Sequence, residues 1–148
     1  MGERACTTPV CRLLVLTLAA LGIVGWSGDD YQQGLTAYER KDHSQAFAIW
    51  QPLAEQGHVE AQFNVGYMYV TGQGVGQDRE IGVNWYRKAA ALGHAKAQFN
   101  VGLALLKGEG VSVDLAGAVK WLQKAVDQGY APAQHALGSL SGVKMLGL

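Results

Sequence analysis

The run AQFNVG at residues 61–66 decides the fold, because the same six letters return at residues 97–102. The two copies are 36 residues apart (97 minus 61), and the residues between them repeat as well, so that Trp85 returns as Trp121. A third copy begins at Ala133. Self-similarity at a fixed step of a few tens of residues indicates stacked supersecondary units rather than one globular core. The sequence therefore predicts a solenoid.

Each copy divides into two helices separated by a glycine-rich run. The first helix is expected at about residues 60–70 and ends before residues 72–76, where glycines can adopt the positive φ that follows a helix C-terminus. The second helix is expected to begin at Asp78, whose carboxylate can cap free amides, and to end at Leu92. No segment shows the sustained alternation of a strand. The predicted fold class is all-α, an α/α solenoid of antiparallel helix pairs with a 36-residue period.

The repeat step also predicts how the chain is organised. Full units are expected at about residues 59–94 and 95–130, a divergent unit at about 29–58 and a partial unit at 131–148, all within one domain from 28 to 148. The charged first helix of the divergent unit suits the end of a solenoid, where one face has no neighbour. His43 or Ser44 is expected to cap its second helix.

Small residues recur inside the predicted helices. Gly66, Gly102 and Gly138 lie in the first helix of successive units. A glycine within a helix costs about 1 kcal/mol relative to alanine, so its return at every step predicts close approach of a neighbouring helix. Trp85 and Trp121 are expected to fill the space between the helix layers.

The start of the chain has the features of a secretory signal. Arg4 and Arg12 precede an apolar run of twelve residues, 13–24, and small residues flank Trp26. Twelve helical residues reach about 18 Å, short of the roughly 30 Å hydrocarbon core. We therefore expect residues 1–27 to be cleaved and the protein to be periplasmic or secreted. Without cleavage, the same segment would be a membrane anchor.

Composition excludes several functional classes. Basic and acidic residues number twelve each, so no charge surplus favours nucleic acid or an anionic membrane as a partner. Both cysteines, Cys6 and Cys11, lie within the predicted signal, so the remaining chain contains no thiol for a disulfide or a thiolate metal site. The repeated His58 and His94 are expected to be turn residues, because stacked units are about 8–10 Å apart and zinc ligands bind at about 2.1 Å. We expect no cofactor and no metal.

The repeated residues resemble a known family. The AQFNVG start, the Gly-x-Gly-Val turn, the aspartate that follows it and the helix WYRKAA at 85–90 are similar to Sel-one-like repeats, relatives of tetratricopeptide repeats. The resemblance covers roughly residues 31–140. It implies an α/α solenoid whose first helices line the concave side, and a role as adaptor or scaffold for protein complexes.

Two fragments imitate catalytic motifs. Ser141 and Lys144 have the Ser-x-x-Lys spacing of penicillin-interacting enzymes, and some cysteine-rich Sel-one-like proteins are linked to β-lactams, so an enzyme active on β-lactams or cell wall is the alternative function. The companion motifs of such enzymes are absent from the sequence. The run 72–76 resembles a phosphate loop, but no strand precedes it and no Gly-Lys-Ser/Thr follows. We therefore predict a protein that is not an enzyme.

The remaining candidate site is the concave groove, which would bind a protein or an extended peptide. Its predicted residues lie opposite the packing stripe of the first helices and are Glu60, Phe63, Asn64, Tyr67, Lys96, Phe99, Asn100 and Leu103. Exposed aromatics beside amides suit a peptide. Alternatively, the phenylalanines belong partly to the core and the asparagines brace the neighbouring unit. The apolar tail, residues 139–148, is expected to fold back over the second helix of the last full unit, or else to support self-association.

Overall fold

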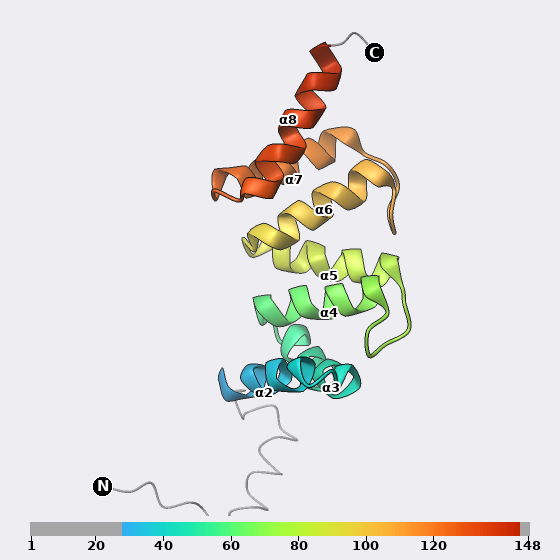
Figure 1. Cartoon of the computed structure of the whole chain (residues 1–148), viewed down its shortest axis with the longest axis vertical. Helices are drawn as coiled ribbons and strands as arrows, with labels where there is room; N and C mark the ends of the chain where they lie inside the picture. Colours follow the sequence, from blue (N-terminus) through green and yellow to red (C-terminus); the bar gives the residue numbers. More distant parts are fainter. Residues whose placement is uncertain (1–27, 146–148) are drawn as a thin grey trace, which may run out of the picture.

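The structure, a computed structural model, describes residues 28–145, with side chains described through residue 140. This part of the chain contains seven α-helices and no strand. They stack along one axis, with the two ends of the described chain at opposite ends of the stack (Figure 1). In order, they are α2 (Gly28–Glu39), α3 (His43–Glu55), α4 (Val59–Thr71), α5 (Arg79–Ala91), α6 (Ala95–Lys107), α7 (Leu115–Asp127) and α8 (Ala131–Met145). The predicted all-α solenoid is confirmed.

Aspartates cap the second helix of each pair. The Ile81 amide donates to Asp78 Oδ1 at 2.9 Å, and one unit later the Gly117 amide donates to Asp114 Oδ1 at the same distance. In the divergent unit, Asp42 caps α3 by accepting from the Gln45 amide at 3.1 Å. The predicted cap at His43 or Ser44 is therefore wrong, because the helix begins at His43 and a carboxylate is available one residue earlier.

The repeat glycines allow two of the helix pairs to pack closely. A Cβ on Gly66 would lie 2.8 Å from Tyr86 Cδ1 and 2.9 Å from the Gly82 carbonyl oxygen. A Cβ on Gly102 would lie 2.7 Å from Leu122 Cγ. Around Gly138, no described atom comes within 4 Å of such a Cβ. The close-approach prediction is therefore confirmed for the two full units and wrong for the last helix.

The tryptophans expected between the layers pack against the core clusters there, but they are only partly enclosed. Trp85 and Trp121 are half-buried, and the ammonium groups of Lys88 and Lys124 lie 3.8 and 4.4 Å from their ring centroids. Trp50 is the tryptophan that fills the interior, at 2% exposure. A lysine one turn along the helix can cover an indole face by a cation–π contact, which keeps these two rings at the surface.

The loop within each unit lies against the preceding unit. Gly110, with φ of 72°, approaches the backbone of Arg79 so closely that a Cβ there would lie 2.5 Å from the Arg79 carbonyl. Gly74 meets the backbone of His43 in the same way. Each loop therefore covers the first turn of the second helix in the unit before it.

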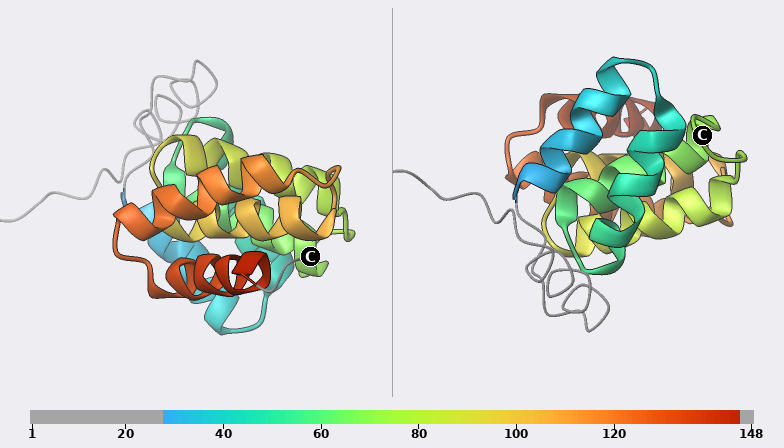
Figure 2. Two further views of the ribbon diagram at one scale, coloured as in Figure 1. Left: turned by 90° about the horizontal axis from the view of Figure 1, so that it is seen from above. Right: turned by 90° about the horizontal axis from the view of Figure 1, so that it is seen from below.

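The last helix departs from this regular stack. Residues 139–145 continue α8, whose far end points away from α7 in Figure 1 and which is foreshortened in the view from above in Figure 2. The tail therefore does not turn back over α7 within residues 139–145, and residues 146–148 lie outside the described part. No described helix is both long and apolar enough to cross a bilayer. The predicted signal, residues 1–27, also lies outside the described part.

Candidate functional site

Two spaces between successive first helices form the candidate site. We define the first interval as the space between α2 and α4, with α3 behind it, and the middle interval as the space between α4 and α6, with α5 behind it. Both are built by the same kinds of contact, because α3 and α5 stand at equivalent places in their units.

A ring of one first helix stacks on the imidazole that precedes the next first helix. Tyr31 stacks on His58 in the first interval, with ring centroids 4.8 Å apart and an interplanar angle of 18°. Phe63 stacks on His94 in the middle interval, at 4.6 Å and 22°. Tyr130 replaces histidine in the last unit and meets Phe99 edge-on at 5.4 Å. These pairs join successive first helices along one side of the stack.

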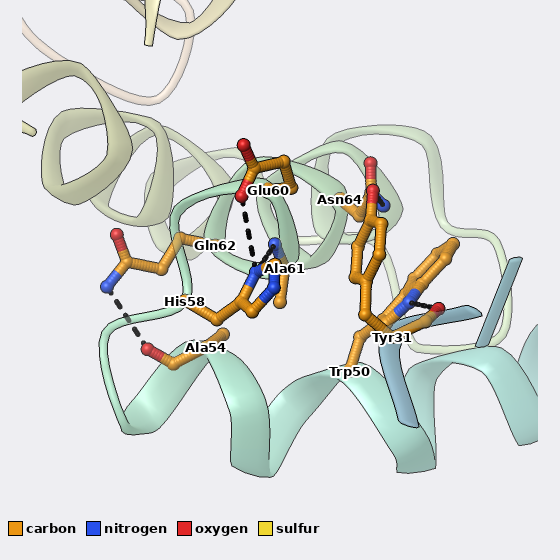
Figure 3. A network of polar contacts seen from close by, with 8 residues as sticks. All are labelled: Tyr31, Trp50, Ala54, His58, Glu60, Ala61, Gln62 and Asn64. Carbon is orange, nitrogen blue, oxygen red and sulfur yellow. Dashed lines mark hydrogen bonds and ion pairs between the residues drawn. The ribbon is translucent and has the colours of Figure 1, made fainter. Parts of the chain in front are cut away.

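Both histidines also cap the helix that follows them. The Ala61 amide donates to His58 Nδ1 at 3.2 Å, as Figure 3 shows, and the Ala97 amide donates to His94 Nδ1 at 3.1 Å. Glu60 lies 3.4 Å from the same His58 nitrogen, but an Nδ1 that accepts an amide hydrogen carries no proton to share with a carboxylate. Burial lowers the pKa of His94. Both histidines are capping residues, and no described cluster of three His, Cys, Asp or Glu side chains could hold a metal ion.

The two repeated asparagines have partners inside the molecule. Asn64 Nδ2 donates to the Tyr31 hydroxyl at 3.1 Å (Figure 3). Burial raises the pKa of Tyr86 far above its usual value, and a hydrogen bond with Asn100 offsets part of that rise. The asparagines thus brace neighbouring helices, as the second of the two sequence interpretations expects.

A hollow of about 190 Å³ lies in the middle interval. Its walls come from α4, α5 and α6 and from the loop after α6, and its lining residues are Tyr67, Val70, Arg79, Val83, Tyr86, Asn100, Leu103, Ala104, Lys107 and Glu109. Aliphatic and aromatic side chains form most of the lining, and three charged residues stand at one end. An apolar recess with a few polar groups is the usual form of a binding pocket.

The charged residues of the hollow are free to meet a ligand. Arg79 is the first residue of α5, Lys107 is the last residue of α6, and Glu109 follows in the loop. All three are exposed. Within the described part of the chain, none of them forms an ion pair.

The structure brings together only part of the predicted groove. Tyr67, Asn100 and Leu103 line the hollow, and Tyr67 is 38% exposed. Phe63 and Phe99 are half-buried in the joints described above. The other three predicted residues lie outside the hollow: Glu60 and Lys96 are exposed near the starts of their helices, and Asn64 belongs to the first interval.

Sequence reasoning missed the part of the hollow that α5 and the loop supply. All the predicted groove residues lie on first helices. The hollow is also lined by residues of the second helix and the loop, namely Arg79, Val83, Tyr86 and Glu109. The close packing at Gly66 and Gly82 offered a signal, because helices in such contact expose residues of both on one face. The Ser141 and Lys144 side chains of the alternative enzymatic reading lie outside the described residues.

The fold and the groove define the class of protein as a short α/α solenoid of repeated helix pairs. The sequence profile of the Sel1 repeat matches residues 19–58, 59–94 and 95–130, which together cover more than half of the chain. The chain belongs to the Sel1 repeat family. Proteins of this family are in general protein-interaction modules, and typically non-catalytic adaptors or regulators.

Solved structures of relatives have the same fold. A Sel1 repeat protein from Oxalobacter formigenes is 40% identical with a TM-score of 0.71, over 77% of this chain and 45% of that one. A protective antigen of uropathogenic Escherichia coli with an SLR fold is 35% identical with a TM-score of 0.75, over 83% and 27%. Cysteine-rich protein B of Helicobacter pylori, 24% identical with a TM-score of 0.59 over 62% and 69%, shares the fold.

A curated relative is a regulatory protein. The chitin synthase regulator SKT5 of Saccharomyces cerevisiae is 35% identical over 74 residues, which are 50% of this chain and 10% of the yeast protein. The chain thus spans about a tenth of that relative's length, and under half of the first two structures above.

Proposed function

We propose that this protein is an exported protein-protein interaction module, an adaptor or scaffold that holds a segment of a partner protein in the groove between α4 and α6. The observation that carries the proposal is the hollow of about 190 Å³ in the middle interval. It combines an apolar lining with Arg79, Lys107 and Glu109 at one end. This combination suits an extended segment that carries both apolar and polar side chains.

The relatives support binding rather than catalysis. Family members are typically adaptors or regulators, and the yeast relative is by its name a regulator of an enzyme. We therefore propose that this chain is not an enzyme. A β-lactam hydrolysis assay tests the alternative: activity that disappears in Ser141→Ala would overturn the proposal.

The groove is tested by affinity capture from periplasmic extract, read by mass spectrometry. The double variant Tyr67→Ala and Leu103→Ala removes apolar surface from the hollow without touching the stacked ring pairs. Leu92→Ala with Leu115→Ala is the matched control, because these side chains are 59% and 61% exposed and lie outside the hollow. Partners lost only with the groove variant support the assignment. Identical partner sets from all three proteins would contradict it.

Export is proposed from residues 1–27, and the mature protein would then be periplasmic or secreted. Mass spectrometry of the exported protein should find a new N-terminus near Ser27. An intact N-terminus in the membrane fraction would make the segment an anchor, and a cytoplasmic protein would refute export. Self-association through the apolar tail is a further proposal, which a monomer at all concentrations in analytical ultracentrifugation would refute.

A further inference from the structure

The hollow exists because three side chains are smaller in the middle interval than in the first. The residues of the two intervals can be aligned one to one. Gly34 packs on Trp50 as Gly66 packs on Tyr86, so each residue of α2 corresponds to the residue of α4 that lies 32 positions later (66 minus 34). Elsewhere the step is 36. A hydrogen bond confirms the register, because the Asp42 amide donates to the Ala37 carbonyl as the Asp78 amide donates to that of Tyr69.

In this register, three large residues of the first interval have small counterparts. Tyr38 corresponds to Val70, Phe47 to Val83 and Met68 to Ala104, and the three small residues all line the hollow. The first interval is thus filled by its own side chains, whereas the middle interval is open at the same place.

Tyr38 shows what this place accepts. Its hydroxyl donates to Gln73 Oε1 at 2.7 Å. Its ring lies edge-on to His43 at 4.7 Å between centroids and tilted against Trp50 at 5.7 Å. The ring therefore packs among aromatic neighbours, while the hydroxyl reaches an acceptor in the loop of the next unit.

The middle interval keeps counterparts of the three groups just named, although Tyr67, which also interacts with the Tyr38 hydroxyl, is replaced by Leu103. One step of 36 residues converts Gln73 into Glu109, His43 into Arg79 and Trp50 into Tyr86, and all three counterparts line the hollow. The loops that carry Gln73 and Glu109 also sit alike, because Gly74 meets the backbone of His43 and Gly110 meets that of Arg79. The hydrogen-bond acceptor and the aromatic wall therefore remain, while the tyrosine between them is replaced by Val70.

We propose that the hollow binds a tyrosine side chain of the partner protein, which takes the place that Tyr38 occupies in the first interval. This rests on the proposed function of the groove. The space is sufficient, because a cavity of about 150 Å³ can hold benzene, and the hollow measures about 190 Å³. The bound ring packs on Tyr86 and Val83, and its hydroxyl donates to the Glu109 carboxylate.

The charges of the hollow favour tyrosine over phenylalanine. A phenol donates a hydrogen bond, and hydrogen bonds to an ionised acceptor are stronger than those between neutral groups. The Arg79 guanidinium, where His43 stands in the first interval, attracts the face of either aromatic ring and so adds to binding without distinguishing the two. A phenylalanine ring would leave Glu109 without this donor.

The test is nuclear magnetic resonance titration of the full-length protein with N-acetyl-L-tyrosinamide and, separately, N-acetyl-L-phenylalaninamide. We expect the tyrosine derivative to shift the amide signals of Val70, Val83 and Ala104, and the phenylalanine derivative to bind about tenfold more weakly. Glu109→Gln restores the acceptor of the first interval and should keep the preference, whereas Glu109→Ala should remove it. Equal binding of both derivatives, or no shift at these amides, would overturn the proposal.

A variant that fills the hollow from within provides the decisive control. Val70→Tyr reproduces the first interval and should abolish binding, and Ala104→Met should do so independently if Val70→Tyr perturbs the fold. Val119→Tyr adds the same ring at an exposed site on α7 and should leave binding unchanged. Binding that survives both filling variants refutes this site. If Tyr67→Ala with Leu103→Ala still eliminates captured partners in that case, the proposed function stands and the tyrosine assignment alone fails.

Discussion

The first and middle intervals share one backbone plan and differ in how completely their own side chains fill it. In the first, Tyr38 occupies the space between α2, α3 and the loop after α4, and its hydroxyl is held by Gln73. In the middle, Val70 leaves the corresponding space open. A solenoid can therefore assign stability to one joint and binding to the next without changing its fold. The following experiments test that division.

Overpacking the helix contacts should have the largest effect. Gly34→Leu and Gly66→Leu would force a side chain into Trp50 and Tyr86 respectively, and each should lower the free energy of unfolding by about 3 kcal/mol. Gly138→Leu is the control, because it meets no described neighbour and improves helix propensity by up to about 1 kcal/mol. Chemical denaturation measures all three, and equal stability of the first two with wild type would disprove close packing.

Exchanging the residues that fill the two intervals should have opposite effects. Tyr38→Val opens the first interval and removes ring contacts with His43 and Trp50, so we expect a loss of about 2 kcal/mol. Val70→Tyr fills the middle interval and should leave stability within about 1 kcal/mol of wild type, or raise it. Thermal and urea unfolding compare them. Similar losses from both variants would show that the intervals do not differ in filling.

Removing the two bracing asparagines should lower the free energy of unfolding by a smaller amount, and by different amounts in the two intervals. Asn100→Ala leaves the hydroxyl of Tyr86, a residue 4% exposed, without this partner, and should cost about 1 to 2 kcal/mol. Asn64→Ala should cost about 0.5 kcal/mol, because the half-buried Tyr31 can bond to water. Urea unfolding measures both losses, and the reverse order would contradict the assigned partners.

Acidification should have the smallest effect, and it should act on the joint at His94. Burial lowers the pKa of His94 in the folded protein, so its contribution is fully present above the unfolded value near 6.5 and is lost as pH falls below it. Protonation also removes the Nδ1 acceptor that caps α6. The midpoint of thermal unfolding should fall between pH 7.5 and 5, and less so in His94→Asn, which keeps a cap without titrating. An identical pH dependence in that variant would rule His94 out.

The sequence predicts the regular parts of this molecule well, because the repeat supplies two copies of every local signal. Asp78 and Asp114 cap the helices they were predicted to cap, and the observed helix ends differ from the predicted ones by about one residue. The capping roles of His58 and His94 were missed, although each stands one residue before a helix as the aspartates do. The residues that favour an N-cap are serine, threonine, aspartate and asparagine, so a histidine before a helix predicts only a turn residue.

The hollow could not be predicted from the sequence, because it depends on a register that the sequence conceals. The loop between α2 and α3 is four residues shorter than its later counterparts, which shifts α2 out of the 36-residue step. Only the packing of Gly34 on Trp50 shows that Tyr38 and Val70 are equivalent. The three small side chains that leave the space open also lie on three different helices, so no single stretch of sequence indicates the hollow.

Each ring–imidazole pair described above connects a first helix only to the start of the next one, and this affects how the gene can lengthen. A tandem duplication of residues 59–94 would place a second copy of Phe63 opposite a second copy of His94, and each loop would again lie over the helix before it. Every new boundary would reproduce an existing one. The protein can therefore extend its reach in whole units, and each added unit brings one more interval whose filling can then diverge.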